Sequence, residues 1–440
     1  MILGGTQQAD GTRATLDDLF RRAGVRRAQA LALIDPPNGA TIASSAPRRL
    51  TYAEADRAIS ALAAKLRGLG LQADTVVALQ LANTVDSVIA LLGVLRAGMI
   101  AAPLPLLWRK QEMVAALALI GAKAIITSSR IGAAAQSTSF AEIATQVAAE
   151  LFPIRHICGF GRGLPDGVVP LDDVFVSVST EFFQPDARPG HAAAHVAAIT
   201  FDVTGDGLVP IARSQSALIA GGLAAFLEGG LAQDTTILSA IPLGSFAGIV
   251  LTLVPWLLAG GTLALHHGFD PAVFAEQCRA HDSSAVILPG PTLAPLADAG
   301  LLGDQIKNIF ALWRAPEQLA GAAPWQRDAV VVDIASFGET GLLPARRGPD
   351  GLPAPIPPDA APRGGTGLIA VGFYRFRQRE VDAAVAAIDP AAVIAALPDA
   401  YLGQRLAGSA QDGAALAAEL QARGVNSLIA GAFSPRGNAA

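Results

Sequence analysis

The sequence has few cysteines and no recognisable export signal. Its two cysteines, Cys158 and Cys278, lie far apart and outside any C-x-x-C spacing. This excludes a disulfide framework and a thiolate metal site, and it favours a reducing compartment, so we expect a cytoplasmic protein. Residues 1–20 lack a basic start followed by a long apolar run, so the sequence predicts no secretory signal.

The chain also lacks a surplus of positive charge. Lysine and arginine number 32 against 37 aspartates and glutamates, which gives a formal net charge of −5 over 440 residues. Because a phosphate backbone is held by basic side chains, we expect no nucleic acid partner. Apolar residues make up 52 % of the chain and charged residues 16 %. This composition excludes global disorder and predicts a large buried core in two or three domains.

One long apolar stretch, residues 237–265, carries no charged side chain and exceeds the roughly 20 residues that a membrane-spanning helix needs. It is interrupted by turn-forming residues, namely Pro242, Gly244, Gly248, Pro255, Gly260 and Gly261. The resulting order of strand, turn, helix, turn and strand is typical of a buried parallel sheet. We therefore predict no membrane span, and a membrane-associated scaffold is the weakest of the alternatives.

Strands and helices alternate along most of the chain. Thr51 and Glu54 have the spacing of a capping box and start a helix that ends near Gly68. Short apolar segments predict strands, and amphipathic segments between them predict helices: strands at 75–83, 122–129 and 195–203, helices at 87–98 and 271–281. This alternation predicts an α/β fold with parallel or mixed sheets covered by helices.

A proline- and glycine-rich segment, residues 346–365, reads as an exposed connector. Strands at 367–371 and 392–397 and helices at 378–387 and 413–423 follow it. We predict a large N-terminal domain of residues 1–362 and a small α+β domain of residues 363–440.

Two parts of the sequence resemble a known superfamily. Residues 50–108 look like the first segment of the adenylate-forming enzymes, which include acyl-CoA synthetases, adenylation domains and luciferases. Residues 371–388 and 397–405 resemble the small C-terminal domain of acyl-CoA ligases. The resemblance therefore extends over nearly the whole chain, in the right order.

The resemblance implies a two-step reaction. A carboxylic acid attacks the α-phosphate of ATP to give an acyl-adenylate and pyrophosphate, and a thiol such as coenzyme A then displaces AMP. It also implies ATP or AMP, Mg²⁺ and coenzyme A as cofactors, and a mobile lysine near the reacting oxygens. The four lysines of this chain are Lys65, Lys110, Lys123 and Lys307, so the C-terminal part contains none. Arg436 is the last basic residue.

By the same resemblance, a phosphate-binding loop is expected within residues 200–210. Its nucleotide-binding candidates are Thr204, Gly205 and Gly207. However, Asp202 and Asp206 place two carboxylates where phosphates are expected, and Pro210 stands at the family's lysine position. Repulsion between like charges then disfavours ATP. The alternative interpretation is a structural turn between a strand and a helix.

Residues 336–341 resemble the family's Tyr-Gly-x-Thr-Glu turn. The resemblance makes Phe337 and Gly338 candidate nucleotide contacts and Thr340 and Glu339 candidate catalytic residues, with Glu339 as the tentative Mg²⁺ ligand. A plain turn with a solvated Glu339 is the alternative.

Two further segments match the family in outline. Ala315 and Pro316 take the place of its Gly-Ala-Pro adenine turn, although the bulky Arg314 precedes them. Ser245 stands where many acyl-CoA ligases have a histidine, and together with Phe246 it is a candidate substrate-pocket residue. For Phe246, as for Phe226 and Trp256, core packing is the favoured alternative.

The remaining polar clusters have less specific patterns. Arg375, Arg377 and Arg379 favour a solvated helix face over a phosphate site. His266 and His267 follow a strand without a third ligand at metal spacing, so we predict no metal beyond Mg²⁺ with a nucleotide.

These departures from the family pattern leave two hypotheses. The first is an acid–thiol ligase by descent, of the acyl-CoA synthetase type, with weak or lost adenylation. The second is a non-catalytic protein of the same fold that binds a nucleotide, an acyl-CoA or a protein partner. A homo-oligomer is compatible with both.

Overall fold

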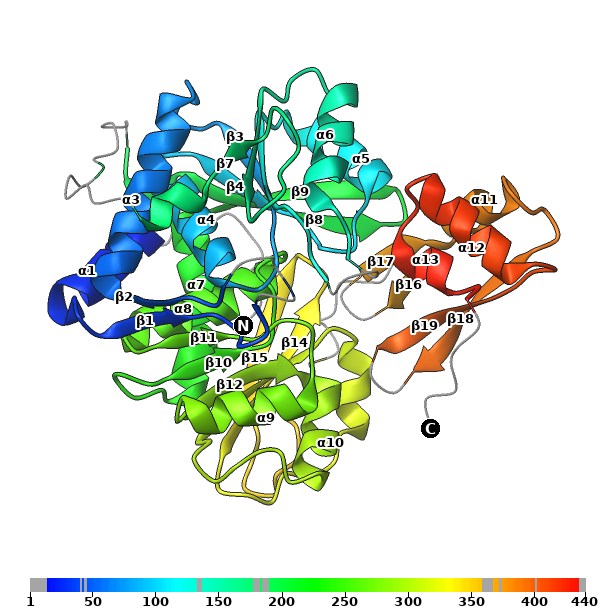
Figure 1. The fold of residues 1–440 in the computed structure, drawn as a ribbon. Coiled ribbons are helices and arrows are strands. Elements are labelled where there is room, and N and C mark those ends of the chain that lie inside the picture. Colours follow the sequence, from blue (N-terminus) through cyan, green and yellow to red (C-terminus); the bar gives the residue numbers. More distant parts are fainter. Residues whose placement is uncertain are drawn as a thin grey trace.

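The computed structural model describes residues 14–39, 42, 46–132, 137–176, 183, 190–357, 367–371, 374–399 and 402–434. Three sheets form the frame of this part of the chain (Figure 1). Two large sheets belong to the N-terminal part, and a small antiparallel sheet comes from the C-terminal residues. The predicted α/β class, with an additional small α+β unit, is confirmed.

The first large sheet has eight strands in the order β15-β14-β13-β12-β10-β11-β1-β2. Its strands are β1 (Leu31–Ile34), β2 (Arg49–Thr51), β10 (Ile237–Ser239), β11 (Leu263–Leu265), β12 (Ala285–Pro289), β13 (Asn308–Trp313), β14 (Val330–Phe337) and β15 (Gly341–Arg346). The strands from β14 to β1 run parallel, and β15 and β2 are antiparallel edges.

The second large sheet has seven strands in the order β7-β6-β5-β3-β4-β8-β9. They are β3 (Val76–Gln80), β4 (Ile100–Pro103), β5 (Ala124–Ser128), β6 (His156–Phe160), β7 (Val169–Pro170), β8 (Val196–Thr204) and β9 (Gly207–Ser214). All neighbours are parallel except β8 and β9. The carboxyl ends of the parallel strands therefore share one edge of this sheet.

Helices cover and separate the two large sheets. They are α1 (Leu16–Arg27), α3 (Tyr52–Gly68), α4 (Val85–Arg96), α5 (Lys110–Ile120), α6 (Phe140–Glu150), α7 (Gln215–Gly229), α8 (Phe246–Ala259), α9 (Pro271–Ala280) and α10 (Leu293–Asp298). The largest hydrophobic cluster joins residues of both sheets with α3, α4, α7 and α8. At its centre Trp256 of α8 is fully buried beside Phe20 and Tyr52.

Local sequence signals are confirmed at several helix starts. The Thr51 hydroxyl accepts a hydrogen bond from the Glu54 N–H at 3.2 Å, and the Thr51 N–H donates to the Glu54 carboxylate at 2.8 Å. Asp270 caps α9 at the predicted start. Residues 237–265 form β10, α8 and β11, in the predicted order, although Gly248 and Pro255 lie inside α8 and not in turns. No helix in the described ranges is long and apolar enough to cross a membrane.

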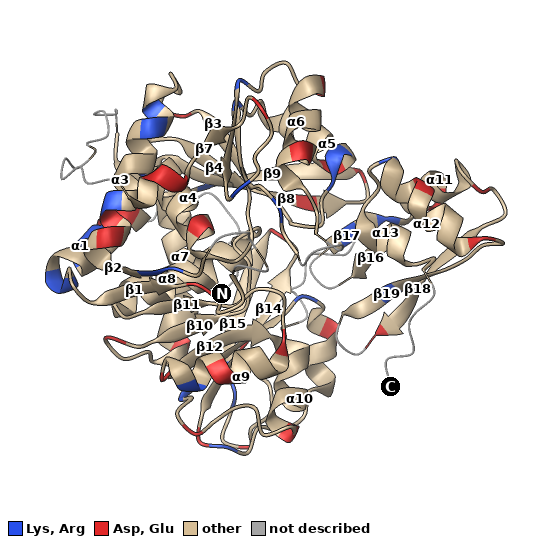
Figure 2. Cartoon of the chain, in the orientation of Figure 1, with Lys and Arg blue, Asp and Glu red and all other residues tan. Residues whose placement is uncertain are grey.

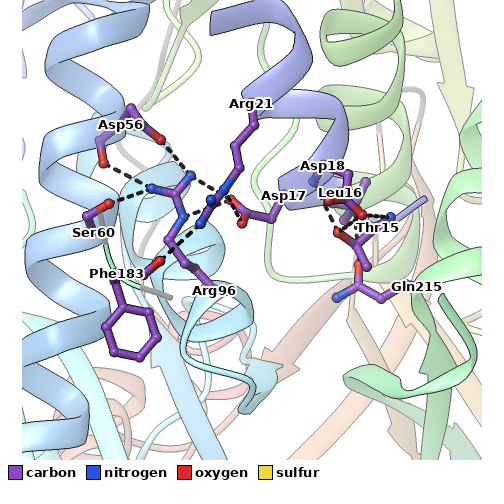
Figure 3. Close-up of polar contacts among 10 residues, drawn as sticks. All are labelled: Thr15, Leu16, Asp17, Asp18, Arg21, Asp56, Ser60, Arg96, Phe183 and Gln215. Carbon is purple, nitrogen blue, oxygen red and sulfur yellow. Dashed lines mark hydrogen bonds and ion pairs between the residues drawn. The ribbon is translucent and has the colours of Figure 1, made fainter. Parts of the chain in front are cut away.

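A polar contact holds α1 against the core. Arg96 of α4 is fully buried, and its Nη2 lies 2.6 Å from an Asp17 oxygen and 2.7 Å from an Asp56 oxygen. Figure 3 shows this guanidinium between α1 and α3, with Ser60 accepting a further hydrogen bond at 2.8 Å. In the view of Figure 2, acidic and basic residues are interspersed along these two helices.

The C-terminal residues form their own sheet, in the order β17-β16-β19-β18. Its elements are β16 (Leu368–Val371), β17 (Tyr374–Arg377), β18 (Val393–Asp399), β19 (Gly403–Ser409), α11 (Gln378–Ala386), α12 (Gly413–Ala422) and α13 (Ser427–Gly431). A separate hydrophobic cluster supports them. The sequence did not predict β19, because its residues GQRLAGS lack an apolar strand pattern. The expected boundary at 362/363, residues 358–365 of the connector and Arg436 lie outside the described residues.

Candidate functional site

A cavity of about 560 Å³ opens where the carboxyl ends of the parallel strands of both large sheets meet. Its walls are formed by the residues that follow β3, β4, β10, β11, β12, β13 and β14, together with parts of β8 and β17. In open α/β sheets, ligands bind at this edge because loops there can vary without disturbing the sheet. The cavity is therefore the candidate site.

Much of the cavity wall is apolar. Aromatic side chains from five segments line it, namely Trp108, Phe140, Phe201, Phe269 and Tyr374. The rings of Trp108 and Phe201 pack with their centroids 5.5 Å apart. Leu81, Leu104 and Ile131 extend the same wall. Such a wall suits a ligand with an apolar body.

One end of the cavity is charged. Arg314, directly after β13, donates from Nη2 to the Ser245 hydroxyl at 2.7 Å. Its Nη1 lies 3.6 Å from Oε1 of Glu339, which makes an ion pair. Burial lowers the pKa of Arg314 to about 10. Burial also raises the pKa of Glu339, and the neighbouring Arg314 guanidinium opposes that rise.

Glu339 also holds the start of α8. Its Oε2 accepts a hydrogen bond from the Phe246 N–H at 2.6 Å, and the Ser245 hydroxyl accepts from the Gly248 N–H at 3.1 Å. A carboxylate is favourable there because the helix N-terminus carries partial positive charge. Arg213 lies over the Phe246 ring at 3.8 Å and donates to the Glu339 backbone carbonyl. Glu339 is thus fixed by groups from three segments.

The C-terminal sheet closes one side of the cavity. Arg375 of β17 places Nη1 3.3 Å from Oδ1 of Asp202 on β8. The neighbouring Tyr374 hydroxyl accepts a hydrogen bond from the Leu107 N–H at 3.2 Å. Gly338 lies against this pair with φ +61°, and a Cβ there would come within 2.6 Å of Arg375 and 2.7 Å of Asp202. The close approach of Arg375 and Asp202 to this backbone explains why position 338 is a glycine.

The interpretation of Arg375 as part of a solvated helix face is wrong. Arg375 lies on a strand and lines the cavity, because β17 pairs with β16 and faces the large sheets. Arg377, two residues on, forms an ion pair with Glu380 at the start of α11.

Known proteins share part of this sequence and the overall fold. Residues 20–159 match the sequence family of AMP-binding enzymes. The amide bond synthetase McbA from Marinactinospora thermotolerans superimposes with a TM-score of 0.69 and 15 % identity, over 93 % of this chain and 94 % of that one. The chain has the adenylate-forming fold.

Other solved structures with this fold are similarly distant in sequence. MbtA from Mycobacterium smegmatis has a TM-score of 0.59 and 20 % identity, over 95 % of this chain and 90 % of that one. A protein from Rhodopseudomonas palustris described as a long-chain-fatty-acid CoA ligase has a TM-score of 0.60 and 19 % identity, over 89 % and 90 %. A search of curated protein sequences finds no match.

The segment expected to be the phosphate loop of this adenylate-forming fold is a β-hairpin. Thr204 ends β8 and pairs with Gly207 at the start of β9, with Gly205 in the turn. The Thr204 hydroxyl donates to the Gly207 carbonyl at 3.0 Å and accepts from the Asp206 N–H at 3.3 Å. The alternative interpretation, a turn from a strand into a helix, is wrong about the helix, because residues 207–214 form β9 and pair back along β8. None of Thr204, Gly205 and Gly207 lines the cavity.

The other nucleotide and catalytic candidates are divided between the cavity and its surroundings. Residues 338–340 connect β14 and β15, and of these Gly338 and Glu339 line the cavity. Thr340 is exposed, and its hydroxyl donates to the Phe337 carbonyl at 2.5 Å. Phe337 does not line the cavity, and neither do Ala315 and Pro316, which start a short 3-10 helix over Pro316–Gly321.

The structure places the two substrate-pocket candidates differently. Ser245 lines the cavity, whereas Phe246 is buried and does not line it. The core interpretation is confirmed for Trp256, which is fully buried, and Phe226 packs against the same core. Sequence reasoning missed His267 and Trp108 as lining residues. The signal available for His267 was its position two residues after a buried strand.

The donor set does not fit a resident metal ion. Mg²⁺ prefers several oxygen ligands, whereas the Glu339 oxygens face the Phe246 N–H and the Arg314 guanidinium. Across the described ranges, no three or more His, Cys, Asp and Glu side chains gather as metal ligands. Burial raises the pKa of both Cys158 and Cys278 to about 12, so neither thiol is a ready nucleophile.

Proposed function

We propose that the cavity binds an apolar carboxylic acid, and that the chain is by descent an acyl-CoA synthetase-like acid–thiol ligase whose adenylation step is weak or lost. The observation that carries the proposal is that the Glu339 carboxylate already contacts the Phe246 N–H and Arg314. Both carboxylate oxygens of Glu339, the family's tentative Mg²⁺ ligand, face protein groups at the site.

The acid is supported by the polarity of the cavity. Its aromatic and aliphatic wall suits an apolar body, and Arg314 supplies a guanidinium at one end. A guanidinium matches the planar, two-oxygen geometry of a carboxylate. A carboxylate ligand here competes with Glu339 for the contact with Arg314, which at 3.6 Å is longer than a direct hydrogen bond.

Weak adenylation is supported by charges that the chain lacks or reverses. Pro210 stands at a lysine position of the family, and Asp202 brings a carboxylate to the cavity wall. Removing one transition-state donor typically costs about 10²–10³-fold in rate, so several such losses leave little activity.

The second candidate is a non-catalytic protein of the same fold that binds a nucleotide, an acyl-CoA or a protein partner. The hydrogen bonds of the Thr204 hydroxyl favour this second candidate. The hydroxyl was expected to contact phosphate, but it is already hydrogen-bonded within the hairpin. A cytoplasmic location, a homo-oligomer and the absence of a nucleic acid partner stay predictions from the sequence.

The test combines binding and turnover on the full chain. Isothermal titration with short, medium-chain and aromatic acids, and separately with ATP·Mg²⁺, AMP and coenzyme A, measures what the site accepts. Pyrophosphate exchange over the same acids measures adenylation. We expect binding of apolar acids with exchange near background. Robust exchange that survives Arg436→Ala overturns weak adenylation, and absence of binding by every acid overturns the proposed ligand.

A further inference from the structure

Two adjacent histidines at the carboxyl end of β11 have different surroundings. His266 uses both ring nitrogens within the protein: Nδ1 lies 2.6 Å from Oε1 of Gln277, and Nε2 accepts from the Asp270 N–H at 3.2 Å. His267 accepts at Nδ1 from the Asn83 N–H at 3.3 Å, and its Nε2 has no hydrogen-bond partner among the described residues. His266 is thus a structural residue, whereas Nε2 of His267 is available to a ligand.

The Asn83 contact decides which nitrogen of His267 carries the proton. A neutral imidazole that accepts at Nδ1 donates at Nε2. Burial, together with the neighbouring His266, lowers the pKa of His267 to about 4, so the ring is neutral near pH 7. His267 therefore presents an uncharged N–H donor at the wall of the cavity.

Asn83 also fixes the backbone beside this ring. Its side-chain amide donates to the carbonyls of His266 and Ser239, both at 3.0 Å. The fully buried Asn83 therefore holds the His267 imidazole through its backbone N–H. Its side-chain amide holds the carbonyl of His266. A donor positioned in this way loses little conformational freedom when a ligand accepts its hydrogen bond.

The sheet order separates His267 from the charged end of the cavity. Arg314 follows β13 and His267 follows β11, with β12 and β10 between them. Three strand spacings at roughly 4.8 Å correspond to about 14 Å. The two strands between them contribute apolar lining residues, because Ala240 and Pro242 follow β10 and Pro289 ends β12. A ligand that reaches both ends is elongated and apolar in its middle.

We propose that the His267 end of the cavity selects an acid whose far end carries a hydrogen-bond acceptor, such as a hydroxyl or carbonyl oxygen, about 14 Å from its carboxylate. The inference rests on the proposed function, because the carboxylate is expected at Arg314. It adds the identity of the distal group, which must accept a hydrogen bond.

Three chain-matched probes test it by isothermal titration of the full chain: decanoic, ω-hydroxydecanoic and ω-aminodecanoic acid. The ω-hydroxyl accepts from Nε2, whereas the protonated ω-amine has only donors. We expect the hydroxy acid to bind about three- to tenfold more tightly than decanoic acid, as one hydrogen bond allows, and the amino acid to bind most weakly. His267→Leu should abolish the preference for the hydroxyl. His267→Gln, which keeps an N–H donor, should retain part of it.

His191→Leu is the matched control, because this exposed histidine lies outside the cavity lining. It should leave the preference unchanged. Equal binding of decanoic and ω-hydroxydecanoic acid to the wild type, or a preference that survives in a folded His267→Leu, overturns the inference while the proposed function stands. If none of the acids binds, the result contradicts the proposed function, namely binding of an apolar carboxylic acid. Should His267→Leu unfold, the comparison of probes on the wild type and on His267→Gln still decides.

Discussion

Asp202 and Arg375 form an ion pair at 3.3 Å across 173 residues of sequence. The pair connects β8 of a large sheet with β17 of the C-terminal sheet, at the wall of the cavity. The Arg375 side chain is 31 % exposed, so the pair contributes little to stability. Its consequence is electrostatic. The carboxylate of Asp202 neutralises Arg375, the one arginine of β17 in the cavity wall.

Removing that carboxylate should favour polyphosphates. We expect Asp202→Thr combined with Pro210→Lys to raise ATP affinity by roughly tenfold, because the change removes a negative charge, releases Arg375 and adds an ammonium group on β9. Titration calorimetry with ATP and AMP measures it. Asp206→Asn is the control, since Asp206 is exposed and outside the lining. Micromolar ATP binding by the wild type, unchanged in the double variant, contradicts the interpretation.

Glu339 should matter for stability as well as for the site. We expect Glu339→Gln to lower the free energy of unfolding by about 1–3 kcal/mol, because Arg314 loses its counter-charge and the start of α8 loses a carboxylate. Urea denaturation measures the change. Glu317→Gln removes an exposed carboxylate nearby and should change stability by less than about 0.5 kcal/mol. Equal effects of the two variants would show that the buried contacts contribute nothing.

The buried Arg96 offers a test of the contact between α1 and the core. We expect Arg96→Met to destabilise the protein by about 3–5 kcal/mol, because it removes the buried guanidinium that pairs with Asp17 and Asp56, and Asp17 then keeps only its ion pair with Arg21. Arg22→Met is the control, at an exposed position of the same helix as Asp17. Adding Asp17→Asn and Asp56→Asn to Arg96→Met should recover much of the loss. No recovery would indicate that packing, rather than unpaired charge, causes the destabilisation.

Asp86 predicts a pH dependence. Burial raises its pKa to about 7, opposed by Arg48 and aided by Asp35 and Asp172. Between its ordinary value near 3.8 and about 7, the folded protein keeps a proton that the unfolded chain has released. The contribution of Asp86 to stability therefore decreases as pH rises through this window and is lowest above it.

We expect Asp86→Asn to remove that contribution, because the amide oxygen still accepts from Arg48 without ionising. Relative to wild type, the variant should gain about 1–3 kcal/mol between about pH 5 and about pH 8, measured as the free energy of urea unfolding. Asp173→Asn, at an exposed carboxylate, is the control. A difference between variant and wild type that does not change with pH contradicts the shift.

Most of the fold followed from local patterns. The capping box at Thr51 and the cap at Asp270 start helices where the sequence predicted them, because these interactions span three residues or fewer. Pro242, Gly244, Gly260 and Gly261 correctly separated strand from helix within residues 237–265, whereas Gly248 and Pro255 lie inside α8. β19 escaped prediction because pairing with β18 forms it, and its own residues have no strand pattern.

The candidate site was less accessible from the sequence. The candidates Gly338, Glu339 and Ser245 all line the cavity, but the residues that contact them were not predicted. Arg314, the Phe246 N–H and the hydrogen bonds of His267 come from segments far apart in the chain.

The sequence by itself determined the helices and strands that begin and end at caps and turns, because caps, turns and apolar periodicity act between near neighbours. It also determined which chemical groups are scarce, such as lysine after residue 307. The tertiary structure alone decided that Glu339 faces Arg314 and that Asp202 faces Arg375. It also decided which nitrogen of His267 is left to donate. These properties depend on distances between residues that only the packing of the sheets brings together.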